Sequence, residues 1–250
     1  MTQRLNCAMD IGEQLLVCGA EVHRVEDSVK RICEAFGAVR TDVFIITSSM
    51  VVTVHDSEGN ICTQTRRIIS TGTDFEKIHR LNALSRRICS EGLTASQIQT
   101  ELAQIVAGKS RPLWAECLFY AIISGAFTLF FGGGWIEAAV ALVIGWLIRL
   151  VIYLADNMVS NKIFPKFIAS FMATALAFAV LKLGWVPTVD NMMIGIIMTL
   201  IPGIGLTNAL RDLFTGDSIT GLLRSIEAVL VALAIAAGYF LFAVLGGVVG

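Results

Sequence analysis

The chain has 250 residues, of which 55% are hydrophobic, and a formal net charge of −1. So many apolar residues exclude an ordinary soluble domain of this length, and the near-neutral charge argues against a nucleic-acid partner. Residues 1–113 carry 13 Lys and Arg and 13 Asp and Glu, whereas residues 114–250 carry only 6 and 7. The sequence therefore predicts a soluble domain over residues 1–111 and a transmembrane domain over residues 112–250.

The cysteines and the N-terminus indicate where the soluble domain resides. Six cysteines have no CxxC or zinc-like spacing, so we expect reduced thiols and neither a metal site nor a cofactor. Asp10, Glu13 and Glu21 interrupt any apolar run that could serve as a signal peptide. Both observations favour a cytoplasmic domain.

The soluble part has the patterning of a small α+β domain. From Ile11 to Phe36 the apolar residues recur in steps of four and three, as on one face of an amphipathic helix, and Gly19 leaves two shorter helices as an alternative. Three β-branched runs and two more helical segments follow: Val39–Thr47, Met50–His55, Ile61–Ile69, Asp74–Cys89 and Thr94–Ala107. The expected order is one helix, three antiparallel strands and two helices.

The sequence of this domain gives little support for an enzyme active site. His23, His55 and His79 are possible bases, and Ser48, Ser49 or Cys62 possible nucleophiles. No nucleophile elbow, phosphate-binding loop or HExxH motif surrounds them. We therefore expect no enzyme and assign no catalytic residue.

The second part reads as five membrane spans. Each is about long enough to cross a hydrocarbon core, for which about 20 residues are needed, except the short and interrupted fourth. The expected spans are Trp114–Phe131, Trp135–Leu154, Phe164–Leu183, Asn191–Leu206 and Ser225–Val249. Glu116 and Glu137 lie near span ends, where we expect their carboxylates to face water.

Cations near the span ends predict the orientation. One side has Lys109, Arg111, Arg149, Lys162, Lys166, Arg211 and Arg224, whereas the other has only Lys182. Because positive loops stay inside, the N-terminal domain of this multi-pass membrane protein is expected in the cytoplasm and the C-terminus outside.

The fourth span is broken by Pro202, Gly203 and Gly205. Proline removes a backbone donor and glycine permits non-helical geometry, which a membrane tolerates only where the backbone is buried in protein or lines a watery cavity. Polar residues follow the break at once: Thr207, Asn208, Arg211, Asp212, Asp217, Arg224 and Glu227. An interrupted span beside polar groups indicates a transporter's binding site.

Two interpretations of these charges remain open. They could form an interfacial salt-bridge cluster that anchors the loop. Alternatively, Arg211 pairs with a substrate carboxylate, Asp212 or Glu227 takes part in proton coupling, and Thr207 and Asn208 hold a small polar ligand.

Two segments resemble a known family. The residues from Pro202 to Asp217, continued to Glu227, are similar to a motif of the threonine/serine exporter family. The residues from Gly19 to Glu26, with His23, Arg24 and Glu26 among them, resemble that family's N-terminal signature. The resemblance covers essentially the whole chain.

The resemblance implies a function and a partner. Because long members of this family carry a second membrane unit, the chain looks like the larger half of a split exporter, similar to the two-protein succinate exporters. It implies a secondary-transporter subunit that exports threonine, serine or a dicarboxylate such as succinate, driven by protons, with a short multi-span partner subunit or by self-association. The alternative is a membrane-anchored regulatory or ligand-sensing protein without transport of its own.

Overall fold

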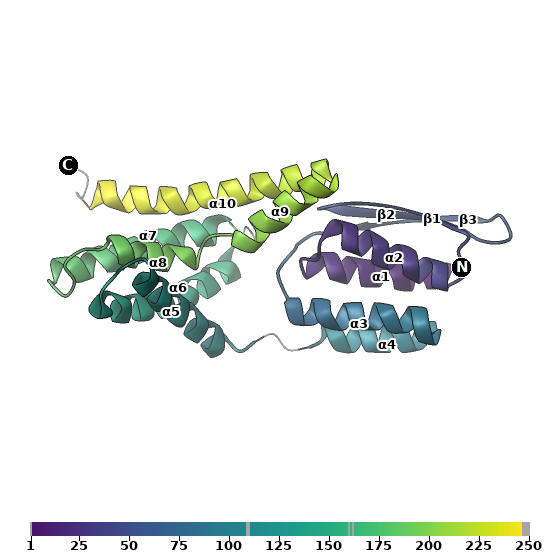
Figure 1. The fold of residues 1–250 in the computed structure, drawn as a ribbon, viewed down its shortest axis with the longest axis horizontal. Helices are drawn as coiled ribbons and strands as arrows, with labels where there is room; N and C mark the ends of the chain where they lie inside the picture. Colours follow the sequence, from purple (N-terminus) through teal and green to yellow (C-terminus); the bar gives the residue numbers. More distant parts are fainter. Residues whose placement is uncertain (1, 109–110, 160, 162, 247–250) are drawn as a thin grey trace. The chain divides into compact units, whose positions relative to one another are not determined.

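The computed structural model describes residues 2–108, 111–159, 161 and 163–246 (Figure 1). The chain forms two compact units, one from residues 1–109 with 207–225 and the other from residues 110–206 with 226–250. Lys109 and Lys162, two of the cations behind the expected orientation, lie outside the described residues, as does the end of the fifth expected span after residue 246. The predicted division between residues 111 and 112 stays a prediction.

The first unit stacks a sheet on two pairs of helices (Figure 1). Apart from residues 207–225, its elements are α1 (Thr2–Val17), α2 (Val22–Ala35), β1 (Arg40–Ile46), β2 (Ser49–His55), β3 (Ile61–Arg67), α3 (Phe75–Glu91) and α4 (Ala95–Val106). The strands are antiparallel in the order β1-β2-β3, and Val52 pairs with Val43 on one side and Gln64 on the other. Met50, Val52 and Val54 alternate into the core, so one face of the sheet is buried by helices.

The prediction of a single N-terminal helix is wrong, because the chain folds there as α1 and α2. Gly19 separates them with a φ of +88°, a region that only glycine enters easily. A Cβ atom at Gly19 would lie 2.3 Å from the carbonyl oxygen of Gly72. Both helices bury their apolar faces in the same core, so the apolar spacing continues across the turn and does not reveal it.

Six further helices follow α4 among the described residues. They are α5 (Leu113–Phe130), α6 (Trp135–Met158), α7 (Ile163–Lys182), α8 (Asp190–Met198), α9 (Gly203–Thr215) and α10 (Ser218–Leu245). Among the described residues, α5, α6, α7 and α10 are long and apolar enough to cross a membrane. The pair α8 and α9 is bent by 60° and would make a fifth span if it crosses as one. The bend lies at the predicted Pro202-Gly203 interruption.

Small residues set the close packing of the second unit. A Cβ atom at Gly145 of α6 would lie 2.3 Å from Oγ of Ser124, and one at Gly195 of α8 would lie 2.3 Å from Oγ1 of Thr128. Both hydroxyl residues belong to α5, so glycines bring α6 and α8 against the same face of α5. Gly238 of α10 approaches the backbone of α7 in the same way.

Candidate functional site

The polar residues after the break sit on a helical hairpin. α9 ends at Thr215, Gly216 turns the chain with a φ of +98°, and the Asp217 N–H donates to the Asp212 carbonyl at 2.9 Å. Gly221 lets α10 approach α9 closely, because a Cβ atom there would lie 2.6 Å from the Leu213 side chain. The hairpin thereby fixes where the charged side chains of both helices point.

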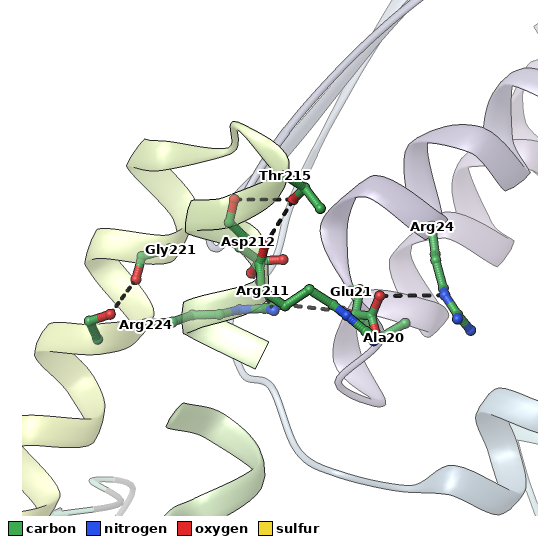
Figure 2. Close-up of polar contacts among 9 residues, drawn as sticks. Ala20, Glu21, Arg24, Arg211, Asp212, Thr215, Gly221 and Arg224 are labelled. Atoms are coloured by element: carbon green, nitrogen blue, oxygen red, sulfur yellow. Dashed lines mark hydrogen bonds and ion pairs between the residues drawn. The ribbon is translucent and has the colours of Figure 1, made fainter. Parts of the chain in front are cut away.

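A buried ion pair joins the two arms of the hairpin. Arg224 donates through Nη1 to Asp212 Oδ2 at 2.8 Å, and through Nη2 to the Ala20 carbonyl at 3.2 Å (Figure 2). The Asp212 side chain is 1% exposed and that of Arg224 is 14% exposed. A carboxylate buried to this degree needs a charged partner, and Arg224 supplies it. The pair also ties the hairpin to the turn between α1 and α2.

Arg211 makes a second connection to the same turn. Its Nη1 donates to Oε1 of Glu21, the residue just before α2, while Arg24 lies 3.4 Å from the other oxygen of that carboxylate (Figure 2). In contrast to Arg224, the Arg211 side chain is 56% exposed. The guanidinium therefore holds a carboxylate through one hydrogen bond at a place that solvent reaches. An arginine can also bind a carboxylate through two parallel hydrogen bonds.

The N-terminal motif completes the cluster from α2. Glu26 accepts a hydrogen bond from the Ile45 N–H at 3.2 Å. The pKa of Glu26 is raised above its usual value, chiefly by burial and also by the negative charge of Asp217. The hydrogen bond from the Ile45 N–H and the nearby His23 lower it by less. His23 and Arg24 are exposed. The two motifs that the sequence singled out, around Gly19–Glu26 and around Arg211–Arg224, thus meet in one compact unit.

Other predicted site residues lie elsewhere. Gly203 and Gly205 are exposed in the first turns of α9, next to Pro202, and they belong to the second unit. Thr207 is exposed and Asn208 is half-buried, both in the first unit. Glu227 is exposed in α10, in the part that belongs to the second unit. The structure unites Arg211, Asp212, Asp217 and Arg224, and the roles of all these residues stay predictions.

Sequence reasoning missed two carboxylates. Glu21 lies in the N-terminal motif, and its place beside His23 and Arg24 is the signal in the sequence that points to its role as the partner of Arg211. Glu137 was expected to face water, which is wrong, because it is only 6% exposed. Its Oε2 accepts from the Gly134 N–H, so the side chain folds back to cap α6 and is buried by its neighbours.

Comparisons with known proteins find relatives that match nearly the whole chain. A "Threonine/serine exporter" of Corynebacterium glutamicum is 25% identical over 94% of this chain and 49% of its own length. A "Probable succinate transporter subunit YjjP" of Klebsiella aerogenes is 25% identical over 98% of this chain and 93% of its own length. A "Pheromone-regulated membrane protein 10" of Kluyveromyces lactis is 24% identical over 99% of this chain. No solved structure matches.

The chain spans very different shares of these relatives. It covers about a quarter of the Kluyveromyces protein and about half of the Corynebacterium exporter, but nearly all of the Klebsiella subunit. The family described as ThrE, threonine/serine exporter, matches residues 6–246, which include both motifs and all the apolar helices. That family consists of membrane exporters and not of enzymes. The protein is thus a multi-pass membrane protein that belongs to the threonine/serine exporter family.

Proposed function

We propose that the chain is the subunit of a secondary exporter that carries the cytoplasmic domain, and that it moves small carboxylates out across the bacterial inner membrane. Threonine, serine and dicarboxylates such as succinate are the candidate substrates, because the relatives named after them cover nearly all of this chain. The subunit works with a second, short membrane subunit, as the word "subunit" in the Klebsiella relative's name suggests. A proton gradient supplies the driving force.

The exposed Arg211–Glu21 pair carries this proposal. Arg211 already holds a carboxylate, and more than half of its side chain is open to solvent. A substrate carboxylate can therefore replace Glu21 on the guanidinium, while the Glu21 carboxylate, which is 20% exposed, keeps Arg24 as its cation. Arg224 and Asp212 are nearly enclosed and keep the hairpin in place during this exchange. Glu21 then acts as the group that occupies Arg211 when substrate is absent.

A regulatory or ligand-sensing role is the second candidate. The hydrogen bond from Arg224 to the Ala20 carbonyl ties the hairpin to the soluble domain, as an anchoring cluster would. In that case the same pairs would transmit a signal and no substrate would cross the membrane.

Flux measurements separate the two functions. The full chain is reconstituted in liposomes, with and without the short membrane subunit. The liposomes are loaded with labelled threonine, serine or succinate. We expect efflux of at least one of these compounds that requires both subunits and rises with an inward pH gradient. If no labelled compound moves under any of these conditions, the exporter function is wrong and the regulatory role gains support.

A further inference from the structure

The second unit contains a buried carboxylate with only neutral partners. Glu137, in the first turn of α6, accepts from the Gly134 N–H at 2.6 Å and from the Thr188 hydroxyl at 3.2 Å. Among the described residues no ion pair includes it. By contrast, Asp212 has Arg224 as partner, Glu116 has Arg149, and Glu227 is exposed. A buried acid without a cation in a membrane-spanning helix is unusual and calls for a functional reason.

Buried hydroxyls continue from Glu137 along α5. A Cβ atom at Gly133 would lie 2.9 Å from the Thr128 carbonyl and 3.0 Å from Glu137 Oε2, so the carboxylate lies beside the end of α5. Thr128 donates to the Ser124 carbonyl at 2.8 Å, and both residues are fully buried. Oγ of Ser124 has no hydrogen-bond partner within the described structure. Buried polar atoms without a partner are rare and call for a functional or structural reason.

The hydroxyl residues Thr128 and Ser124 lie next to α8, the helix that precedes the break. Gly195 of α8 approaches Thr128 and the Ser124 carbonyl, and Gly145 of α6 approaches Ser124 from the other side. A movement of α8 against α5 therefore changes the surroundings of these hydroxyls directly. The break at residues 199–202 allows α8 to move separately from α9.

The charged residues on the neighbouring helices do not neutralise Glu137. α8 begins with Asp190 and α7 ends with Lys182, and both are exposed. Glu116 of α5 and Arg149 of α6 pair with each other near the start of α5, and Asp156 near the end of α6 is exposed. α10 has Glu227 near its start, also exposed.

From this geometry we infer that Glu137 is the proton-carrying group of the exporter. It takes a proton on a carboxylate oxygen from water on the side of the α5–α6 turn, and the rearrangement of α8 that moves substrate outward releases that proton toward the other side. Thr188 and Gly134 hold the unprotonated form by donating to it, and the hydroxyls of Thr128 and Ser124 provide acceptors along α5. This inference rests on the proposed export function and adds the coupling residue to it.

If Glu137 has only a structural role as a helix cap, the expected effect of Glu137→Gln is the opposite. Glu137 is also the third residue of α6, where its side chain accepts from the N–H of the N-cap residue Gly134, a bond that glutamine can make as well. If the residue only caps α6, Glu137→Gln leaves all transport unchanged. If it carries the proton, Glu137→Gln keeps the fold and substrate exchange but abolishes transport driven by a pH gradient.

Two assays on the full reconstituted exporter test this. One follows exchange of labelled threonine or succinate against unlabelled compound without a gradient, and the other follows efflux driven by an inward pH gradient. We expect Glu137→Gln to exchange like the wild type and to show gradient-driven efflux no greater than empty liposomes. Asp156→Asn, at an exposed carboxylate of the same helix, is the control and should retain both activities. Wild-type exchange with retained gradient-driven efflux in Glu137→Gln would overturn the inference, as would coupling to sodium instead of protons.

A milder variant covers the case in which Glu137→Gln does not fold. Thr188→Val removes one donor to the carboxylate at an exposed position, so the fold is expected to persist. Loss of this donor should shift the pH dependence of efflux toward higher pH, because the unprotonated form is stabilised less. An unshifted profile would contradict the inference. If the wild-type exporter shows no exchange, the export function itself is refuted. Infrared difference spectra then test Glu137 separately. A protonated-carboxyl band that appears on acidification of the wild type must be missing in Glu137→Gln.

Discussion

Arg211 and Arg224 lie on one hairpin and both contact the turn before α2, yet their burial differs greatly. Arg224 neutralises a carboxylate that is 1% exposed, whereas Arg211 is mostly exposed. We expect Arg224→Ala to lower the free energy of unfolding by about 3 kcal/mol, because it leaves Asp212 buried without a cation. Arg211→Ala should cost at most about 1 kcal/mol, as exposed ion pairs do. Denaturant unfolding of the full chain in detergent measures both, and equal losses would contradict the assigned burial roles.

Glu26 predicts a pH dependence of stability. Its pKa in the folded protein is raised, chiefly by burial, so between the ordinary value of about 4.3 and the raised value the folded state binds more protons than the unfolded state. Stability is therefore highest below the ordinary value and falls as the pH rises through the raised one. Glu26→Gln should flatten this decline in thermal unfolding temperature, and Glu34→Gln, at an exposed position of the same helix, should keep it. An unchanged slope in Glu26→Gln would refute the assignment.

Sequence reasoning at this scale identified the charged residues but not their partners. Composition and spacing singled out Arg211, Asp212 and Arg224 because charges beside an interrupted span are unusual. Their pairing with Glu21 and Ala20 depends on a contact between distant parts of the chain, which no local periodicity encodes. The burial of Glu137 was missed for a related reason, since its position near a span end says nothing of the Thr188 hydroxyl that covers it.

The hairpin of α9 and α10 depends on one glycine. A Cβ atom at Gly221 would lie 2.6 Å from the Leu213 side chain and 2.8 Å from the Leu213 backbone nitrogen. Since backbone cannot yield easily, Gly221→Ala should push the helices apart and lower the unfolding free energy by about 2 kcal/mol. Gly205→Ala is the matched control, because its Cβ atom would meet nothing closer than 4.0 Å. There alanine should be neutral or stabilising, by up to about 1 kcal/mol, as expected within a helix. Equal effects of the two substitutions would contradict the close packing.

Most elements could be predicted from apolar spacing and turn residues. The strands and the helices α3 to α7 start and end within about two residues of the expected positions in most cases, since each has a clear pattern and flanking Gly, Pro or charged residues. The fourth span was predicted as broken, and the structure has the bend there. The sequence predicts one N-terminal helix and offers the division into α1 and α2 only as the alternative, because both helices pack into one core and the apolar spacing continues across the turn.

At the scale of the whole molecule, the orientation in the membrane is directly testable. Cys89 in α3 is exposed, whereas four of the other cysteines are buried and Cys62 is half-buried. If the N-terminal domain is cytoplasmic, a membrane-impermeant thiol reagent should label Cys89 in inverted membrane vesicles but not in intact cells. Cys89→Ser should remove this labelling. Strong labelling in intact cells would place the domain outside.

The exporter assignment draws on the whole chain, from the N-terminal motif to α10, and the family match spans both motifs. The contact between Arg211 and Glu21 supports the mechanism that we propose, in which substrate displaces an internal carboxylate. Proteoliposome efflux of labelled threonine and succinate by Arg211→Ala tests it most directly, with Arg86→Ala, at an exposed position in α3, as control. Efflux should fall to background in Arg211→Ala, with normal protein levels and folding, and stay at the wild-type rate in Arg86→Ala. Wild-type efflux by Arg211→Ala would show that substrate does not bind where Glu21 now lies.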